Sequence, residues 1–184
     1  MLKSIRLVFV LLVICGLGYP LLLTGVSQVL MPAQAEGSLL ENKAGEIIGS
    51  RLIGQSFTDP GYFHGRISSI NYDAAGSGTP NYSPSNEEMI ERTKSDMAKF
   101  LEENPAVKKT DIPADLVTNS GSGLDPDVSL QGANIQVSRV AKERGISEKS
   151  LYDLIDKHTE GRSLGLFGEP RINVLEINIA LDDM

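Results

Sequence analysis

A long uncharged stretch near the N-terminus limits what this chain can fold into more than any other feature of its sequence. No charged residue occurs from Leu7 to Met31, and the stretch begins with the Leu- and Val-rich run LVFVLLVICGLGYPLLL. At 1.5 Å per residue, about 25 helical residues extend roughly 37 Å, which exceeds the hydrocarbon core of about 30 Å. The glycines and the proline in the run are better tolerated in transmembrane helices than in soluble ones. We therefore predict a transmembrane anchor in residues 1–31.

A cleaved signal peptide is the alternative interpretation of this stretch. Lys3 and Arg6 provide a basic start, and Ala33-Gln34-Ala35 has the A-x-A form of a cleavage site. The apolar region of a signal peptide is usually about 7–15 residues long, and the run here is much longer. We favour the uncleaved anchor on that ground.

The charges on either side of the run predict its orientation. Lys3 and Arg6 precede it, and the first charge after it is the acidic Glu36. The positive-inside rule then places the N-terminus in the cytoplasm. We expect a single-pass protein of the cell (inner) membrane, with its soluble domain on the extracytoplasmic side.

The remainder of the chain is acidic and contains no cysteine. The whole chain carries a net charge of −7, and Lys3 and Arg6 are the only charges in residues 1–31, so residues 32–184 carry −9. Nucleic-acid binding is disfavoured because it requires a basic surface. The single cysteine, Cys15, lies inside the apolar run, so a disulfide or a thiolate metal site in the soluble part is excluded, and we expect no metal site.

The pattern downstream of the anchor predicts one α+β domain. Residues 32–45 are small and polar and read as a linker, and residues 46–184 form the soluble domain. We expect, in order, a strand at 46–57, a long loop at 58–84, a helix from Ser85 to Pro105, a connection at 110–126, helices at 130–144 and from 147 to 158, a loop at 158–171 and a strand at 172–183.

Several helix ends are marked by residue type. Ser85 and Glu88 have the spacing of a capping box. Ser129 and Ser147 are good N-caps, and Gly145 is suited to the left-handed position after a helix. The last strand is predicted from alternation, because Leu175, Ile177, Ile179 and Leu181 would share one face.

The segment SGSGLDPDVS, residues 120–129, resembles a catalytic or phosphate-binding loop in composition. It has no Lys for a Walker A loop, and Ser122 lacks the first glycine of a nucleophile elbow. A hydrolase using Ser122 with His158 and Asp125 remains an alternative supported by composition only. Asp125-Pro126 and the glycines favour a structural turn, and we expect no catalytic residue here.

Several blocks of the sequence together resemble one known family. LIGQSF, YFHGR, PSN, DLVTNSGSGLDPDVS, QVSRVAKERG and HTEGRSLGLFGEPRINVLEINIALD occur in order over most of residues 47–182. In this combination the chain resembles the C subunit of Kdp-type potassium-transporting ATPases. Asp127 and Leu130 depart from the family pattern, which usually has His and Pro there.

The resemblance implies a non-catalytic accessory subunit of an ATP-driven potassium uptake complex, needed for assembly and stability. Implied partners are the channel-like A subunit, the P-type ATPase B subunit, the small F subunit and the lipid bilayer. We expect the domain to dock on the channel-like subunit through its two long loops. The candidate contact residues are Tyr72, His158, Glu160, Arg162, Glu169 and Arg171.

The resemblance also implies an alternative role, that of a catalytic chaperone which raises the ATP affinity of the ATPase subunit in a transient ternary complex. Gln136 and Arg139, on one predicted helix, would then be the nucleotide-binding residues. No cofactor is expected to bind firmly, and ATP is expected only together with the ATPase subunit. An extracytoplasmic domain conflicts with this alternative, because ATP is hydrolysed in the cytoplasm.

Overall fold

One continuous helical segment occupies Leu2–Leu30 of the computed structural model, which describes residues 2–184. It consists of α1 (Leu2–Val13), a π-helical turn η1 (Ile14–Gly18) and α2 (Tyr19–Leu30). The π turn ends two residues before Pro20, whose ring would meet the carbonyl group of Gly16 in a regular α-helix. The segment has a mean hydropathy of 2.5 over 18 residues and no buried side chain, so it is long and apolar enough to cross a membrane.

The chain divides into two compact units, Met1–Leu39 and Leu40–Met184. The predicted linker, residues 32–45, contains the short helix α3 (Pro32–Ala35) and strand β1 (Leu39–Glu41). β1 pairs with β2 (Ile47–Ser50) in a two-stranded sheet. The strand predicted at 46–57 is therefore too long, because the chain turns at Ser50, whose hydroxyl accepts from the backbone N–H of Leu52 at 3.1 Å.

The second unit is built on a three-stranded antiparallel sheet in the order β3-β5-β4. β3 (Asp127–Ser129) pairs with β5 (Arg171–Asn173), with Val128 opposite Ile172. β4 (Thr159–Glu160) pairs with the other edge of β5, with Glu160 opposite Arg171. The strands are short, and helices contribute most of the core.

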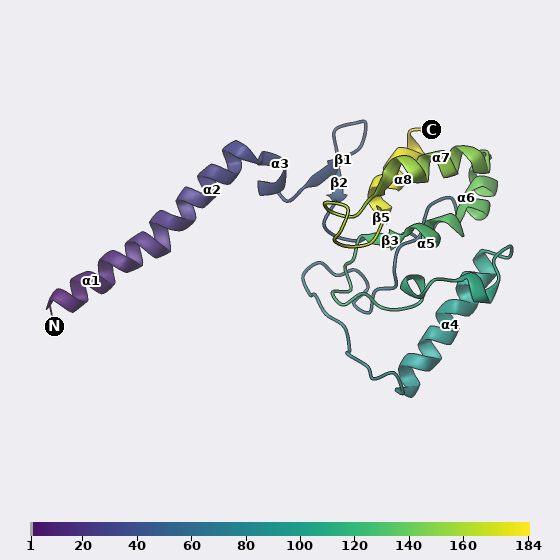
Figure 1. The fold of residues 1–184 in the computed structure, drawn as a ribbon, viewed down its shortest axis with the longest axis horizontal. Coiled ribbons are helices and arrows are strands. Elements are labelled where there is room, and N and C mark those ends of the chain that lie inside the picture. Colours follow the sequence, from purple (N-terminus) through teal and green to yellow (C-terminus); the bar gives the residue numbers. More distant parts are fainter. Residues whose placement is uncertain (1) are drawn as a thin grey trace. The chain divides into compact units, whose positions relative to one another are not determined.

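Helices gather on this sheet, as Figure 1 shows for α5, α7 and α8. The helical elements of the second unit, in chain order, are α4 (Glu87–Glu103), the short 3₁₀ turns η2 (Lys109–Asp111) and η3 (Ala114–Leu116), α5 (Leu130–Asn134), α6 (Val137–Arg144), α7 (Glu148–His158) and α8 (Val174–Asp182). Three predicted ends are confirmed: Ser129 caps α5, Ser147 caps α7, and Gly145 follows α6 with φ of 68°. The predicted α+β class is likewise confirmed.

The strand predicted at 172–183 is wrong beyond its first residues, because Val174–Asp182 is helix α8. The buried positions Val174, Ile177, Asn178 and Leu181 are spaced i, i+3, i+4 and i+7, which is the helical period. The side chain of Asn173 caps the helix by accepting from the backbone N–H of Glu176 at 3.1 Å. The alternation of apolar residues concealed this period because one core position is polar.

Two helix predictions need smaller corrections. α4 is capped by Asn86, whose side chain accepts from the backbone N–H of Met89 at 2.9 Å, and the predicted capping box from Ser85 does not form the helix start. The helix predicted at 130–144 is interrupted at Ile135 and Gln136, between α5 and α6.

The core lies between the sheet and helices α5 to α8. Its fully buried apolar side chains come from all of these elements and from the long loop: Phe63, Ala133, Val137, Val140, Leu151, Ile155, Ile172 and Ile177. Phe63 is the largest of them, and it anchors the loop before α4 in the interior.

Candidate functional site

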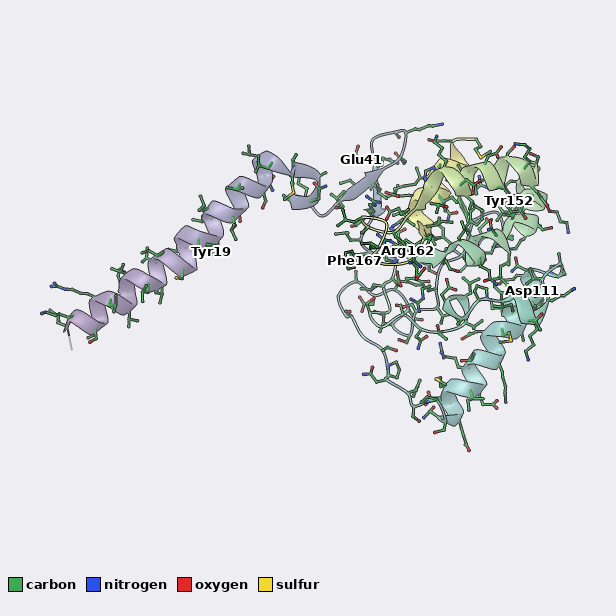
Figure 2. The ribbon with its side chains drawn as sticks, in the orientation of Figure 1. Tyr19, Glu41, Asp111, Tyr152, Arg162 and Phe167 are labelled. Atoms are coloured by element: carbon green, nitrogen blue, oxygen red, sulfur yellow. The ribbon has the colours of Figure 1, made fainter. Side chains whose placement is uncertain are left out.

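The predicted contact residues near the C-terminus lie on one hairpin. We call residues 159–173, from β4 to β5, the β4–β5 hairpin. At its base the guanidinium group of Arg171 contacts the carboxylate groups of Glu160 and Asp127, each at 2.8 Å. Further out, Arg162 contacts Glu169 at 2.7 Å. The structure thus brings four of the six predicted contact residues together, as two cross-strand ion pairs (Figure 2 labels Arg162).

The ion pairs at the base continue into the rest of the unit. Arg51 contacts both Glu160 and Glu176, the latter at 3.1 Å, and so links the turn after β2 to the hairpin and to α8. Burial raises the pKa of the Asp127 carboxyl and Asp125 adds to this, while Arg171 lowers it. These side chains are mutually engaged, so the arginines predicted as partner anchors first serve to hold the hairpin.

His158 and Tyr72 are placed differently from the other four. His158 is the last residue of α7 and is half-buried directly before β4. Tyr72 lies in the long loop, where its hydroxyl donates to the carbonyl oxygen of Arg66. A cavity of about 380 Å³ lies between the long loop and the base of the hairpin. Arg66 lines it from the loop, Arg171 from the hairpin, and Asp125 and Asp127 from the segment at the start of β3.

The start of the long loop is held by side chains of α6 and α8 and by Gln136, directly before α6. The carbonyl oxygens of five consecutive residues, 60 to 64, all accept hydrogen bonds from side chains. Arg139 donates to Pro60 and Tyr62, and Arg144 donates to Gly61. Asn178 donates to Phe63, and Gln136 donates to His64. We call residues 60–64 the clamped segment. The amide oxygens of Asn178 and Gln136 also accept from the backbone N–H groups of Phe63 and His64, at 2.9 and 2.8 Å. Two side-chain amides thus pair with the backbone as a neighbouring strand would.

Gln136 and Arg139, the residues predicted for a nucleotide, are both buried in this arrangement. Besides its loop contacts, Arg139 donates from Nε to Asn104 Oδ1 at 3.0 Å and from Nη2 to Gln136 Oε1 at 2.7 Å. Burial lowers the pKa of the Arg139 guanidinium, and Glu103 and Glu143 oppose that effect. The donors of both side chains are directed to the protein's own acceptors.

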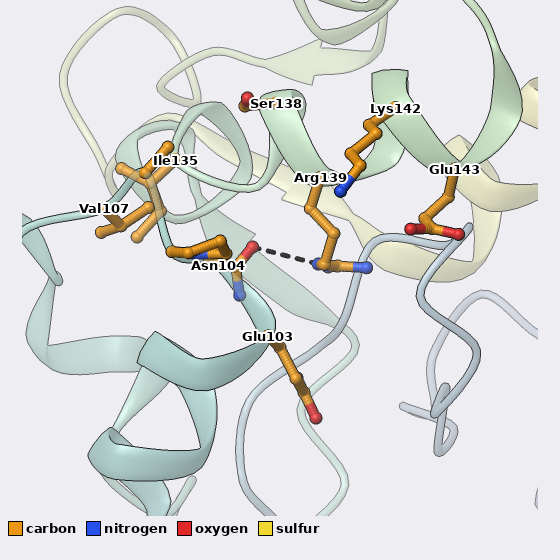
Figure 3. A pocket seen from close by; sticks show the side chains of 10 residues that line it. Glu103, Asn104, Val107, Ile135, Ser138, Arg139, Lys142 and Glu143 are labelled. Carbon is orange, nitrogen blue, oxygen red and sulfur yellow. Dashed lines mark hydrogen bonds between the residues drawn. The ribbon is translucent and has the colours of Figure 1, made fainter.

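A small pocket lies beside Arg139, between the end of α4 and helix α6 (Figure 3). Its volume is about 90 Å³, well below the roughly 300–1,000 Å³ typical of small-molecule sites. Lys142, Glu143 and Glu103 supply charges of both signs at its lining. Nearby, burial and the positive charge of Arg139 lower the pKa of His64, although Glu103 lies 3.4 Å from its Nδ1.

The segment 120–126 before β3 forms a turn against which the long loop folds. The carbonyl oxygen of Ser122 accepts from the backbone N–H of Gly78 at 2.8 Å, and that of Gly123 accepts from the Ser68 hydroxyl at 2.6 Å. The carbonyl oxygen of Leu124 accepts from the backbone N–H of Gly54 at 2.8 Å. The hydroxyl of Ser122 accepts from the backbone N–H of Leu124 at 3.0 Å. Asp125 is held by Arg66 at 2.7 Å. These contacts support the structural interpretation of this segment.

The two glycines of this turn are expected to respond differently to substitution. Gly123 has φ of 72°, and a Cβ atom there would lie 2.7 Å from Ile70 Cγ1 and 3.0 Å from the carbonyl oxygen of Gly78. Gly123→Ala is expected to lower the free energy of unfolding by about 2 kcal/mol, because it adds a strained left-handed residue to a crowded site. Gly121→Ala, which meets no atom within 4 Å, is the matched control and should change it by less than about 0.5 kcal/mol. Urea unfolding of the full chain in detergent measures the free energy of unfolding of both variants. Equal stability of the two variants would contradict the requirement for glycine at position 123.

Two features of this region were not predicted from the sequence. One is the role of Asn178, which the alternation of its neighbours concealed. The other is the apolar end of the β4–β5 hairpin, where Leu164, Leu166 and Phe167 are strongly exposed. The glycines at 165 and 168, with φ of 72° and 80°, are the signal in the sequence that could have indicated a tight hairpin end.

Comparisons with known proteins identify close relatives. The model of one family, described as "KdpC: K+-transporting ATPase, c chain", matches residues 1–183. A protein of Bacillus cereus (strain B4264) named "Potassium-transporting ATPase KdpC subunit" is 54% identical over 180 residues, covering 98% of this chain and 93% of the relative. A Bacillus anthracis protein of the same name is 52% identical over 177 residues, covering 96% and 92%.

Proposed function

Because the chain belongs to the KdpC family and is thus a subunit of a potassium-transporting ATPase complex, we propose that it assembles and stabilises that complex without taking part in the chemistry of ATP hydrolysis. Leu2–Leu30 anchors it in the membrane, and the domain from residue 40 docks on the extracytoplasmic face of the channel-like subunit. The observation that carries this proposal is the anchor itself: a long helix with Lys3 and Arg6 at its N-terminal end, an uncharged apolar run after them, and an acidic domain beyond.

The second unit supports a docking role through the β4–β5 hairpin. The hairpin is held from within by paired charges and presents apolar side chains at its end. A hydrophobic centre with a polar rim is the common composition of protein interfaces. The cavity beside it extends the candidate surface toward Arg66, and so toward the loop that carries Tyr72.

The nucleotide alternative has weaker support. The small pocket beside Arg139 and the internal hydrogen bonds of Gln136 and Arg139 favour a structural role for both residues. In this proposal ATP binds to the ATPase subunit, and this chain acts on that subunit only through the assembled complex.

Sidedness is the decisive test of the proposal. Lys149, exposed on α7, is replaced by Cys in a Cys15→Ser background, which leaves one thiol for a membrane-impermeant maleimide. We expect labelling from outside intact cells (or spheroplasts, where an outer membrane is present). Ser4→Cys in the same background is the matched control, because it keeps Lys3 and Arg6, and it should react only after the cells are opened. Labelling of Lys149→Cys only in opened cells would overturn the extracytoplasmic assignment.

A further inference from the structure

The end of the β4–β5 hairpin concentrates exposed apolar surface in a way that the rest of the unit does not. Leu164, Leu166 and Phe167, which we call the hairpin tip, are 88, 74 and 65% exposed. Among described residues 40–184, the other strongly exposed large apolar side chains, such as Ile47 and Tyr152, stand singly along the chain. Single exposed apolar residues are common on protein surfaces, whereas a cluster marks an interaction site.

The hairpin itself fixes the shape of the tip. Ser163 and Phe167 form an antiparallel bridge, with N–H to O distances of 2.8 and 3.0 Å in the two directions. Directly below it, Arg162 donates to both carboxylate oxygens of Glu169. The tip is therefore ordered before any partner arrives, which reduces the conformational entropy lost on binding.

Leu164 occupies a backbone conformation that does not suit leucine. Its φ is 55°, in the left-handed region, where Gly and Asn are favoured and other residues are strained. Gly165 and Gly168, at φ of 72° and 80°, are residues that tolerate this region. An exposed leucine in such a position contributes nothing to the core and strains the turn. This combination indicates that the leucine side chain contacts a partner outside the domain.

The charges around the tip distinguish between a lipid surface and a protein as its partner. Segments that bind anionic lipid headgroups present unpaired Lys and Arg beside their apolar residues. Here both arginines of the hairpin are paired with carboxylates, and residues 32–184 carry a net charge of −9. A neutral rim around an apolar centre matches a protein pocket instead.

We propose that the hairpin tip inserts into an apolar pocket on the extracytoplasmic surface of the channel-like subunit, and that these three side chains are the principal contacts of that interface. The paired arginines position the tip and stay outside the pocket. This inference rests on the proposed function, since it requires the domain to face a partner outside the cytoplasm.

The test uses the complete complex, purified from membranes through a tag on the channel-like subunit. Leu166→Ser with Phe167→Ser is expected to lower the recovered amount of this chain at least tenfold. Leu164→Asn, which removes the apolar side chain but suits φ of 55°, should lower it about threefold while the isolated chain unfolds at an unchanged or higher temperature. Tyr152→Ser, on the exposed side of α7, is the matched control and should leave recovery unchanged (Figure 2 labels Tyr152 and Phe167).

A fluorescence measurement distinguishes the other candidate partners, a lipid surface and a second copy of the chain. The chain contains no tryptophan, so Phe167→Trp is a single reporter in the isolated chain. Its emission should remain that of exposed indole when the chain is reconstituted alone in vesicles of neutral or anionic lipid. A blue shift in either vesicle would assign the tip to lipid or to a second copy and overturn the proposal, as would wild-type recovery of the Leu166→Ser, Phe167→Ser chain. A domain found in the cytoplasm by thiol labelling contradicts the proposed function instead, so the two failures are distinguishable.

Discussion

Replacing Arg139 by methionine is expected to lower the free energy of unfolding of this protein by about 4 kcal/mol. The change removes a buried guanidinium group and leaves the carbonyl oxygens of Pro60 and Tyr62 and the side-chain oxygen of Asn104 without their donor. A buried acceptor that loses its partner costs about 1–3 kcal/mol. For a chain of this size the midpoint of thermal unfolding should fall by roughly 8–16 °C.

Lys142→Met is the matched control for this experiment. Lys142 lines the same pocket on the same helix, but its side chain is exposed, so its replacement should change stability by less than about 0.5 kcal/mol. Circular dichroism of the full chain in detergent during heating and in urea measures both variants. An Arg139→Met chain as stable as the wild type would mean that the contacts of Arg139 do not hold the long loop, and the nucleotide role would regain support.

Asn178→Leu is expected to lower the free energy of unfolding by about 3 kcal/mol, although leucine has the same branched skeleton of heavy atoms. The amide of Asn178 is buried and satisfies both the N–H and the C=O of Phe63, at 2.9 Å each. Leucine leaves both backbone groups buried without partners, and each costs about 1–3 kcal/mol. Urea unfolding at pH 7 measures the loss.

Asn178→Asp gives the same prediction a pH signature. A neutral carboxyl can still accept from Phe63 N–H and donate to Phe63 O, whereas an ionised one cannot donate and carries a buried charge. Burial therefore raises the folded-state pKa of this carboxyl above its unfolded value, so the folded state binds more protons between the two values. Stability should be low at pH 7 and should rise, relative to the wild type, as the pH falls through that interval. A variant whose deficit is the same at pH 7 and pH 4.5 would refute the role of the amide as a donor.

The parts of this fold that the sequence predicted are those with local causes. Ser129, Ser147 and Gly145 act on the turn next to them, so their residue type alone identifies helix ends. The long apolar helix at Leu2–Leu30 has a similarly local cause, since its length and apolar composition can be read directly from the sequence. The family was recognisable because its blocks occur in a fixed order.

The parts that could not be predicted depend on buried polar side chains with distant partners. Asn178 completes the helical period of α8, and reading only apolar residues left the alternation of a strand. Gln136, with its amide turned to His64, lies where α5 and α6 are interrupted. For the hairpin, composition identified the charged residues, but their pairing depends on strand register. The sequence therefore could not show that the arginines are occupied and the leucines free.

The clamped segment also constrains when the protein can finish folding. Phe63 and Asn178 are separated by 115 positions, and Asn178 lies close to the C-terminus. A chain that emerges from the ribosome, or crosses a membrane, with its N-terminus first exposes residues 60–64 long before their partners exist. During that interval the backbone of Phe63 can bond only to water or to a helper protein, and its docking must await Asn178. A chain that stops before Asn178 would lack the partner of Phe63 and would leave the interior of the domain open.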